Sequence, residues 1–424
     1  MKLINKFWPA FLVLALSAAL IFYKFDLIPK NLAFDEVEFA KLAASLSNRP
    51  YIPYSTQATG HATLYFYLIL LSFGIFKVSN FALRLPSAFF GILSVLMFYL
   101  VMKTVFPKIK KVDYAFLLSI VFLTLRWYFN FARYSFEATF LIFLELTSLY
   151  FTLRCFKTLK WYYLALSGIF AGLAFNSYQP GRIFFLVPLL FLILKPVNSL
   201  TGKLAKPDYR QYRQQIIKQL LLFVIPFLIT ITPLSTYLLF HQDSRFNQEF
   251  FLKNSQLSIG QKAQYLWSNI SSTALMFNFK GDVNGRQNYP LKPALNPIFG
   301  IIFILGFIYS LLKFKNIYNR TFLFYFFVAL IPTVLTYPWE NPNMLRTVTA
   351  IPAVVYFSGR IVYDFIVSDR LKKYKTVFVV LLFFVTAFSM TYEIRTYFLY
   401  QNTVFPQAFG IKENLNQLKI KLGK

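Results

Sequence analysis

The sequence predicts an all-α polytopic membrane protein, and three observations support this fold class. Only 14% of the 424 residues are charged, against about 25% in soluble globular proteins, whereas 57% are hydrophobic. Apolar segments of roughly 17–22 residues recur along the whole chain, and each is long enough to cross a bilayer as a helix. These segments, such as 220–231, lack the alternation of apolar and polar residues that is typical of the strands of a membrane β-barrel.

The charge of the chain indicates contact with lipid rather than with nucleic acid. Lys and Arg number 44 against 16 Asp and Glu, which gives a net charge of +28. In a soluble protein such a charge suggests a nucleic-acid partner. In a membrane protein the positive-inside rule and anionic lipid headgroups account for it. The single cysteine, Cys155, excludes an intrachain disulfide and a cysteine-based metal cluster.

Basic loops predict the orientation of the chain, because positive charge is enriched on the cytoplasmic side of membrane proteins. We assign the Lys/Arg-rich segments to that side, namely 1–6, 103–111, 154–160, 195–218, 313–320 and 370–375. This assignment predicts about eleven transmembrane helices, near 7–24, 84–103, 113–127, 136–154, 161–176, 181–195, 217–240, 297–313, 321–337, 346–367 and 376–392. The N-terminus is then cytoplasmic and the C-terminus external. The first segment is expected to be a retained anchor rather than a cleaved signal peptide.

One apolar segment, 62–78, does not fit this topology as a further crossing. Counting it as a span would place the basic cluster at 103–111 outside and invert every later loop. We therefore expect a helix that lies in or along the outer membrane interface. The alternative is an ordinary span, with the topology compensated elsewhere.

The predicted organisation is a single transmembrane domain over 1–392 followed by a basic external tail over 393–424. Two long external loops, 25–83 and 241–296, are expected to form the active-site face. Because the other loops are short, no soluble catalytic domain is predicted on either side. An active site would therefore be built from external loops and helix ends.

An acidic stretch in the first external loop is the first candidate for chemistry. Asp35, Glu36 and Glu38 stand within four residues, in a chain that is poor in acids. A structural interpretation makes Asp35 the N-cap of a helix and Glu38 its partner in a capping box. That interpretation leaves Glu36 unexplained, together with the polar segment 51–61. Alternatively, a positioned carboxylate at the outer face can act as general base and take the proton of an acceptor hydroxyl during sugar transfer.

Cationic residues at the predicted outer helix ends are suited to stabilise the leaving group of such a reaction. The outer face has no nucleotide sugars, so the donor would be a lipid-linked sugar phosphate, whose departing phosphate Arg, Lys or His can stabilise. The candidates are Arg133, Arg182, Arg346 and His61. Taken singly, an arginine at an interface is more often a snorkelling side chain, and a lone histidine is more often structural. Their predicted location on one side of the membrane favours an anionic lipid ligand.

The segment 279–290 is a second external concentration of polar residues. It carries Asp282, Asn284, Arg286 and Asn288 at alternate positions, and such groups can hydrogen-bond a sugar or a phosphate. Its Gly-Asp and Asn-Gly pairs also fit an ordinary turn. The sequence contains no zinc-protease, P-loop or dinucleotide-binding motif. The acids are compatible with a divalent metal, but their spacing does not require one, so no cofactor is predicted.

Together these features resemble the GT-C class of polyprenyl-phosphate-sugar-dependent glycosyltransferases. Within that class the chain is most similar to the branch of the protein mannosyltransferases and the lipid A aminoarabinose transferases. The resemblance runs from about residue 7 to 367. Its motifs are, in order, Asp35-Glu36, Gly60-His61, Phe73-Gly74, Ala82-Leu83-Arg84-Leu85-Pro86-Ser87-Ala88, Phe131-Ala132-Arg133-Tyr134-Ser135-Phe136-Glu137, Gly172-Leu173-Ala174-Phe175, Gly281-Asp282 and Asn343-Met344-Leu345-Arg346.

The resemblance implies roles for single residues. The family's first-loop acid serves as catalytic base, a role that falls on Asp35 with Glu36 beside it. The family's second acid falls on Glu137, where Asp is common, and Ala62-Thr63 replaces the two prolines that many members carry after the position of His61. The donor phosphate would be held by Arg133, Arg346, Arg182 and His61. The sugar or acceptor would contact Glu137, Tyr134, Tyr178, Asp282, Arg286 and Asn343.

The predicted function is that of a multi-pass plasma-membrane glycosyltransferase with an external active site. It would pass a sugar from a polyprenyl-phosphate carrier to a lipid, glycan or protein acceptor by direct, inverting displacement. One alternative is a transporter or flippase of lipid-linked sugars, which should carry polar groups near mid-span. Another is a non-catalytic scaffold subunit, in which the acids only cap a helix. The predicted spans carry almost no charge apart from Glu145, which favours the enzyme.

Overall fold

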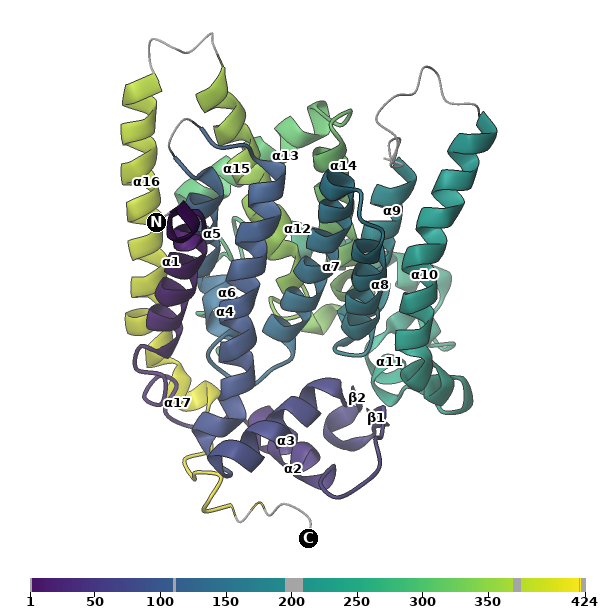
Figure 1. Cartoon of the computed structure of the whole chain (residues 1–424). Coiled ribbons are helices and arrows are strands. Elements are labelled where there is room, and N and C mark those ends of the chain that lie inside the picture. Colours follow the sequence, from purple (N-terminus) through teal and green to yellow (C-terminus); the bar gives the residue numbers. More distant parts are fainter. Residues whose placement is uncertain (1, 110–111, 195–208, 369–374, 419, 421–424) are drawn as a thin grey trace.

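Long helices packed side by side make up most of the molecule, and short elements gather at one end of the bundle (Figure 1). The computed structural model describes residues 2–109, 112–194, 209–368, 375–418 and 420. Within these residues, extended structure is limited to one antiparallel pair, β1 (Tyr54–Ser55) and β2 (His61–Ala62), and three isolated bridges. The predicted all-α class is therefore confirmed, and the chain is a multi-pass membrane protein.

Every predicted span coincides with a helix. The helices that match predicted spans are α1 (Lys2–Phe22), α4 (Asn80–Val105), α5 (Tyr114–Thr124), α7 (Ala138–Thr158), α8 (Tyr162–Phe175), α9 (Leu186–Leu194), α10 (Tyr209–Phe240), α13 (Pro297–Leu312), α14 (Ile317–Val334), α15 (Ile351–Val367) and α16 (Lys375–Arg395). The remaining α-helices are α2 (Phe34–Ser45), α3 (Leu64–Phe76), α6 (Arg126–Phe131), α11 (Ser244–Glu249), α12 (Ile259–Met276) and α17 (Phe405–Ala408). Single turns of 3₁₀ or π type include Gln57–Thr59, Gln179–Ile183, Phe251–Lys253, Pro338–Glu340, Val348–Ala350, Thr396–Tyr400 and Gln401–Thr403.

The predicted number of about eleven crossings is not confirmed. Among the described residues, six helices are long and apolar enough to cross a membrane, namely Asn80–Val105, Ala138–Thr158, Arg213–Phe240, Ile317–Val334, Val348–Val367 and Val379–Thr403. Six further apolar helices have 10–17 residues. A helix of 14 residues such as α8 measures about 21 Å, less than the hydrocarbon thickness of about 30 Å. Parts of the predicted basic loops, at 195–208 and 369–374, lie outside the described residues.

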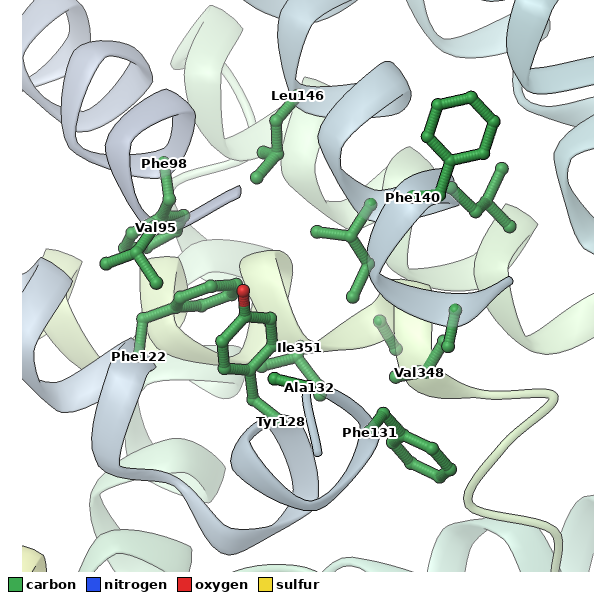
Figure 2. Close-up of a cluster of buried hydrophobic side chains, with 14 of the residues drawn as sticks. Val95, Phe98, Phe122, Tyr128, Phe131, Ala132, Phe140, Leu146, Val348 and Ile351 are labelled. Atoms are coloured by element: carbon green, nitrogen blue, oxygen red, sulfur yellow. The ribbon is translucent and has the colours of Figure 1, made fainter. Parts of the chain in front are cut away.

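Aromatic and aliphatic side chains fill the centre of the bundle between α4, α5, α6, α7 and α15 (Figure 2). Phe98 of α4 stacks on Phe122 of α5, with ring centroids 4.5 Å apart. Phe122 in turn lies 4.2 Å from the ring of Tyr128 in α6. All three rings are buried. Such aromatic pairs stabilise helix packing beyond the burial of their area, so this cluster fixes α6 and the loop that follows it.

Two short helices, α2 and α3, lie across one end of the bundle (Figure 1). With 13 residues, α3 measures about 20 Å and is too short to cross a hydrocarbon core of about 30 Å. Its length favours the predicted interfacial helix over the alternative of a crossing. The loop between α2 and α3 carries the β1–β2 pair, in which Ser55 lies opposite His61.

The Glu36 carboxylate connects α2 to the bundle, and its contacts show that two predictions are wrong. α2 begins at Phe34 with Ala33 as its N-cap, so Asp35 is not the cap and Glu38 does not complete a capping box. Instead Glu36 accepts a hydrogen bond from the backbone N–H of Ala33 at 3.0 Å. It also accepts bonds from Arg84 Nε at 2.8 Å and Nη2 at 2.9 Å, and from the N–H of Ser135 at 3.0 Å. These donors occupy both oxygens, so Glu36 is structural rather than the predicted auxiliary at the acceptor.

The C-terminal segment packs against the segment between α1 and α2 instead of forming a separate tail. α16 runs through Arg395 and continues into a π-helical turn, so the predicted boundary after residue 392 falls inside a helix. Leu32 and Ile411 exchange backbone hydrogen bonds of 3.0 and 3.1 Å. Phe405, Phe409 and Leu415 are buried. The apolar side chains of this segment explain why it folds back onto the bundle. Residues 419 and 421–424 lie outside the described residues.

We expect Glu36→Gln to destabilise the protein strongly, because it leaves the buried Arg84 guanidinium without its counter-charge. Breaking a buried pair by removing one partner costs about 3–5 kcal/mol. Thermal unfolding of the detergent-solubilised protein measures the effect. Glu38→Gln is the matched control, since Glu38 pairs with Lys41 on the surface of the same helix and should change stability by about 0.5 kcal/mol or less. Equal melting temperatures for both variants would show that the Glu36 contacts do not hold this end.

Candidate active site

Segments from distant parts of the chain meet at the end of the bundle that holds α2 and α3 (Figure 1). Their polar side chains form ion pairs with one another there. The contributing segments are the start of α2, β2, the loop before α7, the turn after α8, α11, and the loops before α13 and α15. Each is a helix end or a connection, as predicted for a site built on the ends of membrane helices. Two clusters of charge lie here, one around Asp35 and one around Arg245.

The first cluster brings together two predicted residues that are far apart in the chain. Asp35 Oδ2 pairs with Arg286 Nη1, and 41% of the Asp35 side-chain surface remains exposed. Arg286 is held in place because its backbone N–H donates to Asn284 Oδ1 at 3.1 Å and its carbonyl accepts from Asn130 Nδ2 at 2.8 Å. Asp35 is thus an accessible carboxylate on the first turn of α2, oriented by a guanidinium from the predicted polar segment 279–290.

Asp282 connects that segment to the loop before α15. Its two oxygens accept hydrogen bonds from the backbone N–H groups of Asn284 at 2.7 Å and Met344 at 2.9 Å. Burial raises the pKa of the Asp282 carboxyl to about 6, and the charges of Arg346 and Arg286 oppose this shift. Asp282 therefore positions both arginine-bearing loops and lies within electrostatic reach of both arginines.

The second cluster places two arginines on one carboxylate. Glu249, at the end of α11, accepts from Arg245 Nε at 2.9 Å and pairs with Arg346 Nη2 at 3.1 Å. A second acid, Glu340, pairs with Arg346 at 2.5 Å. Burial alone would raise the pKa of Glu249, but the two guanidinium groups outweigh burial and hold that pKa below its ordinary value. Arg245 and Glu249 were not among the predicted site residues.

His61 and Glu137 extend the second cluster inward. His61 Nδ1 lies 2.7 Å from Glu137 Oε1, and Arg245 Nη1 lies 3.1 Å from His61 Nε2. Both His61 and Glu137 are buried, and Glu137 Oε2 has no hydrogen-bond partner among the described residues. Over the residues described, no group of three or more His, Cys, Asp or Glu side chains is placed to hold a metal ion.

Two predicted tyrosines lie between the clusters. The Arg245 guanidinium stacks over the Tyr178 ring, 5.5 Å from its centroid. Burial raises the pKa of Tyr178 to about 12, and the charges of Arg245 and Arg346 oppose this shift. Burial likewise raises the pKa of Tyr134, and the charges that act on it include Arg286, Asp35 and Tyr178. Both phenol rings also contact the ring of Phe136, at centroid distances of 6.4 Å for Tyr134 and 5.5 Å for Tyr178, and this aromatic contact links the two clusters.

Arg182 and Asn343 support the site from its edge. Arg182 Nη1 pairs with Asp243 Oδ2 at 2.5 Å, and Asp243 also N-caps α11 by accepting from the N–H of Phe246 at 3.0 Å. Arg182 borders a small hollow of about 10 Å³ that His61, Tyr178 and Arg245 also line. The Asn343 amide oxygen accepts from the N–H of Arg346 at 2.9 Å. Asn343 thus shapes the turn before Arg346.

Arg133 is not part of the site, which corrects the prediction that it holds the donor phosphate. Its side chain is fully buried. Its Nη2 donates to the carbonyls of Lys24 at 3.0 Å and Ile28 at 2.9 Å, and Nη1 donates to the carbonyl of Ile21. These acceptors lie at and beyond the C-terminal end of α1, where unpaired carbonyls attract a cation. Arg133 therefore caps α1 and anchors the following loop.

The missed pair, Arg245 and Glu249, carries a weak signal in the sequence. The two residues stand four apart after Asp243, which is the pattern of a capped surface helix with an internal ion pair. What distinguishes this pair is its burial against His61 and Arg346. His61 stands 184 residues before Arg245 in the chain. The spacing of residues within α11 therefore does not predict this contact.

Comparisons with known proteins bear on part of this chain by sequence and on nearly all of it by fold. Residues 60–209 match the family model for dolichyl-phosphate-mannose-protein mannosyltransferase. That range includes His61, Glu137, Tyr178 and Arg182. A search of curated protein sequences gives no match.

Solved structures of an archaeal enzyme share the fold at low sequence identity, and a bacterial structure is less similar. The archaeal oligosaccharyltransferase AglB from Archaeoglobus fulgidus, in complex with an inhibitory peptide and a dolichol-phosphate, has a TM-score of 0.52 at 16% identity, over 96% of this chain and 56% of that chain. The same organism's oligosaccharyltransferase in the apo form gives a TM-score of 0.51 at 16% identity, over 96% of this chain and 56% of that chain. ArnT from Cupriavidus metallidurans bound to undecaprenyl phosphate gives a TM-score of 0.48 at 12% identity, over 94% of this chain and 76% of that chain.

The chain spans just over half the length of the archaeal enzyme that it resembles in fold. Within that limit the two kinds of comparison agree. The family model concerns a glycosyltransferase and covers the loop before α7 and the turn after α8. The archaeal neighbour is also a glycosyltransferase, and its fold extends over almost the whole chain. The resemblance of this membrane protein to the GT-C glycosyltransferases is therefore confirmed by the family model over residues 60–209, and the rest of the bundle shares the fold of the archaeal structure.

Proposed function

We propose that the protein transfers a sugar from a polyprenyl-phosphate carrier to an acceptor hydroxyl at the external face of the membrane. The observation that carries this proposal is the accessible carboxylate of Asp35 in one site with the arginine pair Arg245 and Arg346. The family model for a dolichyl-phosphate-mannose transferase and the dolichol-phosphate bound to the archaeal oligosaccharyltransferase support the donor class. The acceptor is a lipid, a glycan or a protein.

Asp35 is the proposed general base. The acceptor oxygen attacks the anomeric carbon while its proton passes to Asp35, and the bond from the anomeric carbon to the phosphate oxygen breaks. The electron pair leaves with the phosphate, which gives free polyprenyl phosphate, and the configuration at the anomeric carbon inverts. General-base catalysis of this kind typically contributes about 10²–10⁴-fold to the rate. Arg286 contacts only Oδ2 of Asp35, so Oδ1 is the atom proposed to take the proton.

Arg245 and Arg346 are the proposed ligands of the donor phosphate. Both guanidinium groups contact the same oxygen of Glu249, Oε1. The two cations are therefore close enough to bind one anion together. A phosphate can replace the Glu249 carboxylate and accept charge-assisted hydrogen bonds from the same two arginines. In this buried setting such bonds stabilise charge that develops on the leaving group. Arg182 and His61 line the small hollow that Arg245 also lines, and they are proposed to border the sugar phosphate.

The proposed orientation puts the site outside and the basic loops inside. α2, α3 and the clusters lie at one end of the bundle, whereas the described basic segments around Lys103, Arg154 and Lys313 lie at the other ends of their helices. By the positive-inside rule those segments are cytoplasmic. A carrier lipid in the outer leaflet would then bring its phosphate to the level of Arg346 and Arg245.

Asp35→Asn is expected to lower turnover by about 10²–10⁴-fold while the protein keeps its melting temperature, because Asp35 is partly exposed and its carboxylate is not buried. The measurement is release of polyprenyl phosphate when the purified protein is incubated with a panel of polyprenyl-phosphate sugars. Glu38→Gln, on the next turn of the same helix, should keep wild-type turnover. Wild-type turnover of Asp35→Asn would remove Asp35 as the base. Transport of the intact donor without release would favour a flippase.

Arg346→Gln should raise the KM for the lipid donor about 10–100-fold, because it removes hydrogen bonds to a charged group that are worth about 1.5–3 kcal/mol. The matched control is Arg360→Gln. Arg360 also pairs with a carboxylate, that of Asp364 four residues further along α15, and lies outside the two clusters of charge. The same change in KM for both variants would mean that the effect is indirect.

Donor binding should weaken as the pH falls through about 6. Above that pH the Asp282 carboxyl, with its pKa of about 6, is ionised and holds the loops that carry Arg286 and Arg346. Below it the carboxyl is protonated and its attraction for both arginines is lost. Titration of the lipid donor at several pH values measures the effect. The Asp282→Asn variant should bind the lipid donor weakly, and its affinity should depend little on pH between 5 and 7. The same pH dependence of donor affinity in this variant as in the wild type would contradict the role of Asp282.

A further inference from the structure

An apolar groove opens on the side of the bundle, between α8 and α10, away from the polar site. It has a volume of about 440 Å³. Its lining is almost entirely apolar and comes from Ala165, Ile217, Leu221, Leu222, Ile225 and Pro226. Two polar side chains, Lys218 and Gln214, and one amphipathic residue, Trp161, complete it.

The groove results from the way that α8 and α10 cross. The helices touch where α8 carries Gly168 and Gly172: a Cβ atom on Gly168 would lie 2.1 Å from the carbonyl oxygen of Phe223, and one on Gly172 would lie 2.6 Å from Thr230. Such glycines allow close approach of membrane helices. From this crossing α10 diverges from α8 towards the end of the bundle opposite α2 and α3 (Figure 1). The small side chain of Ala165, which precedes the crossing, leaves the space between them open.

The dimensions and polarity of the groove match one leaflet of a bilayer. From Gln214 to Pro226 the groove follows α10 for about 18 Å at 1.5 Å per residue, close to half of a hydrocarbon core of about 30 Å. Trp161 begins the turn before α8 and is exposed, as is typical of tryptophans in the interfacial belt. Lys218 is exposed as well, and no ion pair of Lys218 is found within the described residues.

We propose that this groove binds an acyl chain of an anionic phospholipid from the leaflet opposite the polar site. The chain lies along Leu221, Ile225 and Ala165, and the headgroup phosphate meets the Lys218 ammonium beside Trp161. An ammonium group attracts an anionic headgroup by about 1 kcal/mol per residue near the surface, and the apolar lining excludes the headgroup itself. The ligand differs from the sugar donor in both leaflet and chemistry, so this site does not depend on the proposed function.

Native mass spectrometry of the full-length protein in detergent tests the proposal, with phosphatidylglycerol and phosphatidylcholine of identical acyl chains as probes. We expect one phosphatidylglycerol to be retained with about fivefold higher affinity than phosphatidylcholine, the effect of about 1 kcal/mol. Lys218→Gln should abolish this preference, and Ala165→Trp, which fills the groove, should reduce retention of both lipids. The controls are Lys313→Gln, another exposed lysine of the described basic segments, and Leu117→Trp, at an exposed apolar position of α5.

Equal retention of the two lipids by the wild type would overturn the proposal, as would equal effects of the variants and their controls. Displacement of phosphatidylglycerol by equimolar undecaprenyl phosphate would also overturn it, because the groove would then serve the carrier lipid. The melting temperature of Ala165→Trp shows whether this variant folds. If it does not fold, Lys218→Gln alone tests whether the preference for phosphatidylglycerol is lost, because replacing an exposed lysine does not disturb packing.

Discussion

The Glu36 carboxylate is the constraint on which the polar end of the molecule depends. It is fully buried, and its two oxygens receive donors from the start of α2, from Arg84 in α4 and from the loop before α7. A buried charge is tolerated only when its partners satisfy it completely. The contact therefore fixes three segments relative to one another. Because neighbouring side chains on a helix point in different directions, burying Glu36 turns Asp35 towards the surface. The residue proposed as base is thus oriented by the acid next to it.

The arginines of this end divide into two groups according to what they bind. Arg133 donates to backbone carbonyls at the end of α1, and Arg84 divides its donors between Glu36 and the carbonyls of Pro29 and Asn31 at 2.6 Å. No ligand can replace a backbone carbonyl without unfolding the loop that carries it. Arg245, Arg286 and Arg346 instead pair with side-chain carboxylates, which an incoming anion can displace. The backbone carbonyl partners of Arg133 and Arg84, rather than burial alone, distinguish these two arginines from those that are proposed to bind a phosphate.

The sequence predicts the helices well because long apolar segments have few alternatives in a membrane. It also selects Asp35, Arg286 and Arg346 as candidates, since each stands in a polar segment at a helix end, and the structure places them in the two clusters of charge. It does not separate Asp35 from Glu36, whose partner Arg84 lies 48 residues away, nor does it show that Arg133 reaches the end of α1, 105–113 residues earlier. Arg245 and Glu249 follow a local pattern that fits any surface helix. What local spacing fails to predict is which side chains meet in three dimensions, and that information decides their roles.

α10 connects the two ends of the molecule. Its N-terminal half forms the apolar groove with α8, and its C-terminus leads directly into Asp243 and Arg245. Only 17% of the most apolar stretch of α10 is buried inside the protein. The position of α10 therefore relies on its crossing with α8 at Gly168 and Gly172 and on the surrounding lipid. A lipid chain in the groove would fill the space that α8 leaves open and hold α10 at its observed tilt. Because Arg245 follows α10 by five residues, whatever fixes this helix also fixes one of the two cations proposed to bind the donor phosphate.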